Sequence, residues 1–340
     1  MRAIGIDSHK ASLACCLVDE RGAALEERTL ANDPAGHQEL VAWARQAADA
    51  RIGIEGSASF GAAAARLLVG ARLDVREVPP QLSHRERIRT RRAGKSDPGD
   101  ALAIARVTLR EAELPPVRLA DRSREIGLLV EAREDLLAEA TRVRNRVHAD
   151  LVVLMPGYGG RIVNLTAARN RRAAGRLLRG LAGVQAELAR DRLTRVDRLE
   201  AEAKRLERRL TALVGRHPLR LLPGAGVLST AKLIAETGDV RRFRSADAFA
   251  MLAGVAPIPA SSGQTQRMRL NRGGNRQLNR ALWVIAFTQL RHHPPAKAFM
   301  ARKRSEGKTW AEGLRCLKRH LARLVFRLLV QGAPALAQAA

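Results

Sequence analysis

The sequence predicts an α/β unit at the N-terminus, followed by a longer and mainly helical region. Segments of strand length alternate with segments of helix length over the first 110 residues, whereas the remainder shows almost only helical periodicity. Hydrophobic residues make up 46% of the 340 residues, which suffices for a packed core and excludes a wholly disordered chain. The formal charge divides at the same place, with +3 on residues 1–110 and +23 on residues 111–340.

The first unit contains five predicted strands, at residues 2–6, 11–18, 23–30, 51–55 and 73–78. The first three would form a meander, because a turn signal at residues 19–22 separates the second from the third. Helices are predicted after the third, fourth and fifth strands, at residues 33–48, 61–68 and 97–109. A basic loop is expected at residues 85–95, with Ser96 as the N-cap of the helix that follows. The order β-β-β-α-β-α-β-α is the one expected for a ribonuclease H-like domain.

Two long helices are predicted in the middle of the chain. Pro115-Pro116 marks a boundary, and a helical pattern over residues 121–155 ends where residues 156–160 interrupt it. From Val196 to Leu213 the apolar residues recur with spacings of 3 and 4, which is the heptad pattern of a coiled coil. This seam suits an antiparallel pair with the first long helix, an intermolecular coiled coil, or both. The predicted division of the chain is therefore 1–115, 116–216 and 217–340.

The excess of arginine indicates a polyanionic partner. The chain holds 52 arginines and 8 lysines. A GC-rich genome accounts for arginine in place of lysine, but not for the concentration of the excess in the second part of the chain. Nucleic acid is the expected partner. Because the chain has only ten aromatic residues, extensive base stacking is not expected, and contacts between arginine and phosphate should dominate.

Cysteine content and hydropathy point to the cytoplasm. Three cysteines are too few for a disulfide framework or a cysteine-rich zinc site, which suits a reducing compartment. We see no signal peptide before the first strand, and no apolar run reaches the roughly 18 residues of a membrane helix. We expect a cytoplasmic, nucleoid-associated protein without membrane contact.

Four carboxylates are placed where a metal site could form. Asp7 follows the first predicted strand, and Glu55 ends the fourth. Asp97 and Asp100 are three residues apart in the first turn of a predicted helix, so their side chains share one face of that helix. In a ribonuclease H-like sheet these ends converge, and the resulting repulsion would be relieved by a hard cation such as Mg²⁺. Two such ions would flank a scissile phosphate. The alternative is that the helical acids only complement the helix dipole and that the strand-end acids stand there by chance.

The C-terminal region carries candidate contacts to nucleic acid. The segment Leu222-Pro223-Gly224-Ala225-Gly226 before a helix resembles a helix-hairpin-helix, in which Gly224 and Gly226 would let backbone amides approach a phosphate. An ordinary glycine-rich turn is the alternative. On the predicted long helix, Arg142 and Arg146 are candidate contacts to the RNA or DNA backbone.

A proline-flanked loop presents Ser261 and Ser262 next to a run of arginines. A serine in such surroundings could attack a phosphodiester while guanidinium groups neutralise the developing charge. Taken alone, two loop serines are more often turn residues. The arginines expected to position DNA or to stabilise charge are Arg267, Arg269, Arg272 and Arg276.

Five blocks of this sequence occur in the order found in one known family: Gly5-Ile6-Asp7-Ser8-His9-Lys10, Lys95-Ser96-Asp97-Pro98-Gly99-Asp100-Ala101, Leu222-Pro223-Gly224-Ala225-Gly226, Ser261-Ser262-Gly263 and Leu270-Asn271-Arg272-Gly273-Gly274-Asn275-Arg276-Gln277-Leu278-Asn279-Arg280-Ala281-Leu282. Together they resemble the DEDD transposases of the IS one-ten insertion-sequence family. The resemblance spans nearly the whole chain, and the last block is the most specific.

The resemblance implies a fold and a mechanism. The N-terminal domain would be similar to Holliday-junction resolvases and would be joined by a coiled coil to a mostly helical transposase domain. Asp7, Glu55, Asp97 and Asp100 would bind Mg²⁺, and Ser262 would form a covalent link to DNA. A non-coding bridge RNA would pair with donor and target DNA. The active site would be composite, built from different protomers of a tetramer.

A transposase that acts as a site-specific DNA recombinase is therefore the favoured interpretation. Ser261 precedes Ser262 and stays open as the nucleophile. Other interpretations are a metal-dependent junction endonuclease that uses water, and a non-catalytic nucleic-acid-binding protein. A kinase of the actin-like fold is the weakest, because the basic second part would have no role there. The oligomer could be a dimer or a tetramer.

Overall fold

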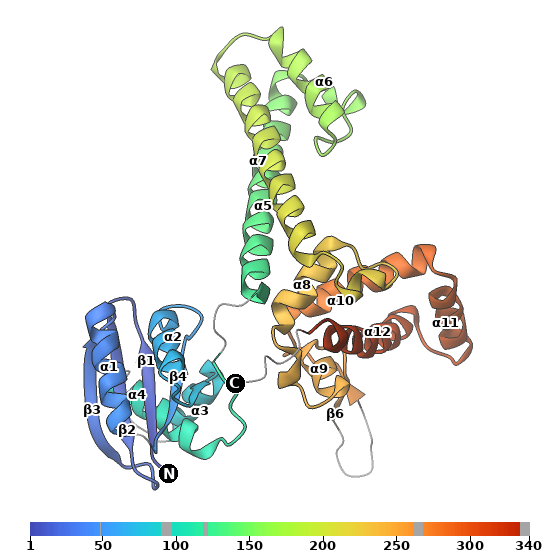
Figure 1. Ribbon diagram of the computed structural model, residues 1–340. Coiled ribbons are helices and arrows are strands. Elements are labelled where there is room, and N and C mark those ends of the chain that lie inside the picture. The colour runs from blue at the N-terminus through green and yellow to red at the C-terminus, as the bar shows by residue number, and fades with distance from the viewer. Residues whose placement is uncertain (48, 90–96, 118–121, 261–267, 334–340) are drawn as a thin grey trace. The chain divides into compact units, whose positions relative to one another are not determined.

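The computed structural model describes residues 1–47, 49–89, 97–117, 122–260 and 268–333 (Figure 1). The chain forms two compact units, Met1–Asp121 and Arg122–Ala340, and each is described by itself. The predicted division into three parts stays a prediction, because its second boundary lies inside the second unit. Across the described residues, no helix is both long and apolar enough to cross a membrane.

The first unit is built on a five-stranded sheet with the strand order β3-β2-β1-β4-β5. β1 (Ala3–Ser8), β2 (Ser12–Val18) and β3 (Ala24–Ala31) pair antiparallel as the predicted meander. β4 (Arg51–Glu55) pairs parallel with β1 and with the short β5 (Val75–Glu77). The strand bounds differ from the predicted ones by at most two residues. This mixed sheet is compatible with a ribonuclease H-like fold.

Helices cover both faces of the sheet because the strand side chains alternate. Ile4 and other larger apolar residues pack with α1 (Pro34–Gln46) and α2 (Ala62–Gly70) on one face. Small residues such as Ala3 face α4 (Asp97–Arg110) on the other. Asp33 caps α1 by accepting a hydrogen bond from the backbone N–H of Gly36, as its position before a proline indicates.

The expected basic loop at 85–95 is wrong in its first part. Residues Pro80–Arg89 form a helix, α3, which packs against α4. Its inward positions are Ser83 and Glu86, so the sequence shows no apolar stripe from which a helix could be predicted. Residues 90–96, including the predicted cap Ser96, lie outside the described residues.

A long helical hairpin opens the second unit (Figure 1). The predicted helix at 121–155 is α5 (Arg122–Leu154), and it packs along α7 (Val184–Val214) over most of its length. Between them come a short turn of 3₁₀ helix, η1 (Tyr158–Gly160), and α6 (Ala168–Arg179), which packs against α7. The within-chain helix pair is therefore present, whereas an intermolecular coiled coil stays a prediction.

The predicted heptad seam is the contact between the two long helices. Val196, Leu199, Ala203 and Leu210 are buried, and the apolar residues that they meet on α5 include Val143. Cross-helix ion pairs fix the register, and these are Arg133–Glu207, Arg144–Glu200, Arg192–Asp150 and Arg195–Glu139. From Arg133 to Asp150 on α5 the partners on α7 go from Glu207 back to Arg192, as expected for antiparallel helices.

The rest of the second unit is a helical block around one hydrophobic core, whose largest fully buried side chain is Phe249. The α-helices of the block are α8 (Val227–Thr237), α9 (Ala246–Leu252), α10 (Arg276–His292), α11 (Pro294–Ser305) and α12 (Trp310–Gly332). Its shorter elements are the 3₁₀ turns η2 (Pro218–Leu221) and η3 (Val240–Arg242) and the paired strands β6 (Ile258–Pro259) and β7 (Met268–Arg269).

Candidate catalytic centre and nucleic-acid interface

Two of the predicted carboxylates lie side by side at the end of the sheet. Asp7 on β1 and Glu55 on β4 are register partners in the parallel pair. The side chain of Asp7 is only 13% exposed, and His9 Nε2 lies 3.2 Å from its Oδ2. Glu55 is half-buried and accepts a hydrogen bond of 2.6 Å from the hydroxyl of Ser83. Because β1 and β4 run parallel and in register, Asp7 and Glu55 lie next to each other at the same end of the sheet.

Two glycines let α4 approach this edge closely. A Cβ on Gly5 would lie 2.2 Å from the carbonyl oxygen of Ala101, and a Cβ on Gly53 would lie 1.8 Å from the hydroxyl oxygen of Thr108. Neither distance is possible for real atoms, so only glycine permits this spacing of helix and sheet. Asp97 and Asp100 occupy the first turn of α4. Asp100 is buried, whereas the side chain of Asp97 lies outside the described residues.

Arg87 on α3 pairs with one of these carboxylates and interacts electrostatically with two more, and no sequence pattern indicated it. Its Nη1 lies 2.6 Å from Oδ1 of Asp100. The hydrogen bond and charge of Asp100 raise the pKa of Arg87, and the charges of Glu55 and Asp7 raise it further. The guanidinium therefore senses all three acids. Because α3 was expected to be a loop, sequence reasoning could not place Arg87 here.

Glu77 is a further acid at this sheet edge that the sequence reasoning missed. It ends β5 beside Ile54 of β4. Burial raises the pKa of Glu77, the nearby charge of Glu55 adds to the rise, and hydrogen bonds from Ser57 and the backbone oppose it. The edge therefore holds a fifth carboxyl group beside the four predicted acids, and its raised pKa favours the protonated form.

The donor set suits a hard divalent cation. Asp7, Glu55 and Asp100 offer only carboxylate oxygens, which such cations prefer, and the charges of all three raise the pKa of Arg87. Within the described residues, however, no group of three or more His, Cys, Asp or Glu side chains is arranged to hold a metal ion. In this arrangement Asp100 is held in an ion pair by Arg87.

The most specific sequence block, residues 270–282, is held by its asparagines. Asn275 caps α10 by accepting hydrogen bonds from the N–H groups of Gln277 and Leu278, and it donates to Glu236 of α8. Asn271 donates to the carbonyl of Met251, and Asn279 donates to the carbonyls that follow α9. These side chains tie the start of α10 to α8 and α9.

Gly274 completes this attachment. A Cβ there would lie 2.3 Å from the Cα of Gly254, so two backbones meet where neither can carry a side chain. Lys318 of α12 donates to the other end of the Asn279 amide at 2.8 Å, and burial lowers the pKa of that lysine. The asparagines of this block are therefore structural, and the arginines between them are exposed.

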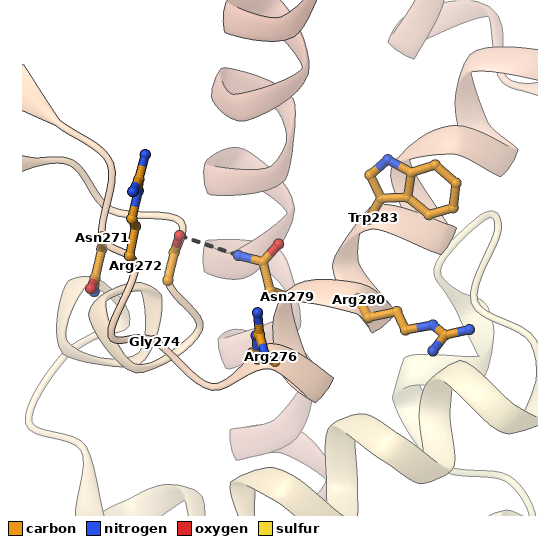
Figure 2. A pocket seen from close by; sticks show the side chains of 8 residues that line it. Asn271, Arg272, Gly274, Arg276, Asn279, Arg280 and Trp283 are labelled. Carbon is orange, nitrogen blue, oxygen red and sulfur yellow. Dashed lines mark hydrogen bonds between the residues drawn. The ribbon is translucent and has the colours of Figure 1, made fainter. Parts of the chain in front are cut away.

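The arginines around this scaffold border an open pocket of about 320 Å³. Figure 2 shows Arg276 and Arg280 projecting from α10, with Arg272 on the facing loop and Trp283 one turn further along the helix. Within the described part of the chain, none of the exposed arginines Arg269, Arg272, Arg276 and Arg280 has an acidic partner. Sequence reasoning did not single out Trp283, which is 41% exposed and stacks on Phe287.

The predicted serine loop lies between β6 and β7 in the sequence. Ser261, Ser262 and Arg267 lie outside the described residues, and the loop enters and leaves through β6 and β7. The pairing of these two strands places Ile258 opposite Arg269. Met268 and Arg269 of β7 border a second pocket together with Asn271 and Arg272, which also border the first.

Two further predicted contacts have different surroundings. Gly224 has a positive φ of 83°, and a Cβ there would lie 2.9 Å from the carbonyl oxygen of Ile285, so this glycine has a packing role. Gly226 is exposed at the start of α8, with open space around it. The segment before it is the 3₁₀ turn η2, so only the second helix of the expected hairpin is an α-helix. On α5, Arg142 and Arg146 are exposed.

Comparisons with known proteins agree with this architecture. A transposase family model of the DEDD, IS110 type matches residues 4–156, and the model described as transposase, IS116/IS110/IS902 family, matches residues 216–301. The insertion element IS900 uncharacterized 42 kDa protein of Mycobacterium paratuberculosis is 28% identical, over 96% of this chain and 94% of its own. The insertion element IS110 uncharacterized 43.6 kDa protein of Streptomyces coelicolor is 29% identical, over 70% of this chain and 71% of its own.

The first match contains all four predicted acids, and the second contains the serine loop and the asparagine–arginine block. A third relative, the insertion element IS116 uncharacterized 44.8 kDa protein of Streptomyces clavuligerus, is 26% identical over 96% of this chain and 94% of its own. The two family models therefore match separate parts of the chain, and together they include the sheet edge with its acids and the start of α10. The chain is a transposase enzyme that belongs to the IS116/IS110/IS902 family.

Proposed function

We propose that this transposase cuts and rejoins DNA by transesterification, with Mg²⁺ held by Asp7, Glu55, Asp97 and Asp100 and with Ser262 as the nucleophile. The observation that supports this most is the pairing of Asp7 with Glu55 at one sheet edge, where their charges and that of Asp100 all raise the pKa of Arg87. Such a gathering of acids is costly unless cations neutralise it. The membership of the DEDD family points to a divalent metal in general.

The chain's own groups have distinct parts in this reaction. The Ser262 hydroxyl oxygen forms a bond to phosphorus, the bond from phosphorus to the 3′ oxygen breaks, and the serine proton ends on the released 3′ hydroxyl. Arg269, Arg272 and Arg276 offset the negative charge that builds on the phosphate oxygens. Mg²⁺, when bound, supplies further stabilisation of that charge. A second transesterification restores the serine and joins the exchanged strands.

Partners follow from the same proposal. Donor and target DNA would contact the basic second unit, and a non-coding bridge RNA would select them by base pairing. Exposed arginines without acidic partners in the described residues, such as Arg142 and Arg146, support binding of a nucleic-acid backbone. A dimer or tetramer would combine the acids of one protomer with the serine loop of another. Sequencing of RNA that purifies with the protein tests the guide: one enriched small RNA is expected, and a random cellular mixture would contradict it.

One observation favours a second candidate, a metal-dependent junction endonuclease that uses water. Every predicted metal ligand belongs to the first unit, Met1–Asp121, whose core is its own. Water could replace the serine without any contribution from the second unit. The two candidates differ in a covalent intermediate, since only the serine reaction leaves protein attached to DNA.

The deciding experiment uses end-labelled donor DNA with Mg²⁺, quenched in denaturing detergent. The wild-type protein and Ser261→Ala are expected to give a labelled covalent adduct, and Ser262→Ala is expected to give none. Asp7→Asn should also give none, and a binding assay in chelator should show that it still holds DNA. An adduct that persists in Ser262→Ala and vanishes in Ser261→Ala would transfer the role to Ser261. Strand cleavage without an adduct in any variant would favour the endonuclease.

A further inference from the structure

Helix α6, at the end of the α5–α7 hairpin, carries a row of exposed arginines that the proposed function does not use. Arg169, Arg172, Arg176 and Arg179 follow one another at spacings of 3, 4 and 3, so they share one face of the helix. The opposite face buries Ala174 and Leu178 against α5 and α7. The helix holds no Asp or Glu at all.

A fifth arginine fixes this face in place. Arg171 is buried at 4% exposure and donates to Asp197 at 2.7 Å and to Glu200 at 2.6 Å, both on α7. It also donates to the carbonyl oxygens of Leu165 and Thr166 just before the helix. Bonds of a guanidinium to carboxylates are the strong kind, and several of them on one group lock the helix against α7.

Both ends of α6 are held as well. Asn164 accepts hydrogen bonds from the N–H groups of Thr166 and Ala167 before the first turn. Arg190 of α7 donates to the carbonyl oxygen of Leu178 in the last turn and to that of Leu181 just after it. The helix is therefore a rigid platform, and a ligand would not have to order it on binding.

The charge of the row is left uncompensated. Asp197 and Glu200 are engaged by the buried Arg171, and Glu200 also contacts Arg144. Among the residues that the structure describes, none of the four exposed arginines of α6 has an ion-pair partner. Like charges at these spacings repel one another, so the row is a cost to the free protein that an anionic ligand would remove.

We propose that the exposed face of α6 binds the phosphate backbone of a nucleic-acid duplex. A helix rises about 1.5 Å per residue, so the row spans about 15 Å. One strand of a duplex advances about 3.4 Å per phosphate, which places about four phosphates along that length. The regular charge of a duplex matches the row better than the irregular charge of an acidic protein surface. The proposal rests on nucleic acid as partner but needs neither Mg²⁺ nor Ser262.

The test measures how binding to duplexes of unrelated sequence depends on salt, in chelator, with the full chain. The variant replaces Arg169, Arg172 and Arg176 by Gln and keeps the buried Arg171. The control replaces three exposed arginines of the first unit, Arg21, Arg45 and Arg66, by Gln, so both proteins lose the same charge. Circular dichroism checks that both variants keep their helices.

We expect the slope of log affinity against log salt to fall by about 2.7 in the α6 variant, since each lost phosphate contact on DNA removes about 0.9. The control should stay within about 0.5 of the wild type. A DNA duplex and an RNA duplex are tested side by side, and a loss confined to one identifies the source of the phosphates. Equal slopes in wild type and α6 variant for both duplexes would overturn the proposal.

Sedimentation of the same proteins separates an acidic protein surface from a nucleic acid. If the α6 variant changes its oligomeric state while its salt slope does not change, the row binds another copy of the chain, and the proposal fails. Ser262→Ala is included and should keep the wild-type slope. The salt dependence of binding therefore tests the role of α6 even if the catalytic proposal is wrong.

Discussion

Replacing Arg87 by alanine should tighten Mg²⁺ binding while weakening the fold in the absence of the ion. Arg87 faces the same carboxylates that are proposed to hold Mg²⁺, so the guanidinium and the ion compete for them. Losing one member of a fully buried ion pair costs about 3–5 kcal/mol. Because Arg87 is 34% exposed while Asp100 is only 8% exposed, we reduce that figure to about 1–3 kcal/mol for solvent screening.

The free energy of the Arg87–Asp100 interaction should also oppose the binding of Mg²⁺. In the wild type Mg²⁺ must displace the guanidinium, whereas in Arg87→Ala it need not. Coupling of about 1–3 kcal/mol corresponds to about 5- to 150-fold, so the variant should reach half-saturation at a correspondingly lower Mg²⁺ concentration. The assay is thermal unfolding of the full chain along a Mg²⁺ titration, starting from chelator.

Arg110→Ala is the matched control. Arg110 Nη1 lies 2.5 Å from Glu86 Oε2, and this pair also joins a partly exposed arginine (41%) to a buried acid (8%). It should lose comparable stability in chelator with no change in the Mg²⁺ midpoint. The reasoning is refuted if Arg87→Ala binds Mg²⁺ no more tightly than the wild type, or if Arg110→Ala shows the same gain.

Two further outcomes concern the second unit. Gly274→Ala should lower the free energy of unfolding by about 1–3 kcal/mol or more, because its Cβ would overlap the backbone of Gly254. Gly273→Ala should lower it far less, because its Cβ would lie 3.7 Å from the nearest neighbour. Chemical denaturation of both variants measures the difference. Burial and the nearby charge of Arg122 lower the pKa of His217 in the folded protein. Its contribution to the free energy of unfolding is therefore complete above pH 6.5, the ordinary pKa of the unfolded chain, and is lost as the pH falls through the lowered pKa. His217→Asn should flatten the dependence of stability on pH in this range, and a dependence like that of the wild type would contradict this reasoning.

The sequence predicted the parts of the fold that rest on apolar periodicity. The strands around Ile4 and Ile54 and the seam at Val196 and Leu199 show the alternation or spacing that burial requires, and the structure confirms those elements. The edge positions of Asp7 and Glu55 followed from the same alternation. Whether they bind a metal stays a prediction.

What escaped prediction is held by polar contacts. The inward face of α3 consists of Ser83 and Glu86, so its helical period was invisible, and with it the position of Arg87. Asn271 and Asn279 of the 270–282 block donate to carbonyls that lie 20 residues or more away, such as that of Met251 for Asn271. One-dimensional spacing carries no record of such partners.

The first residue of α5 lies next to the last turn of α7, at the base of the α5–α7 hairpin. Arg122, at the first residue of α5, donates to the carbonyl of Leu213 near the end of α7, so the two ends meet. The hairpin is thus a detour of about 50 Å, at about 1.5 Å per residue of α5, that closes on its own starting point. Removing seven residues from each helix would shorten this arm by about 10 Å and keep the heptad register. Evolution could in this way set the reach of α6 without disturbing either the sheet edge or the serine loop.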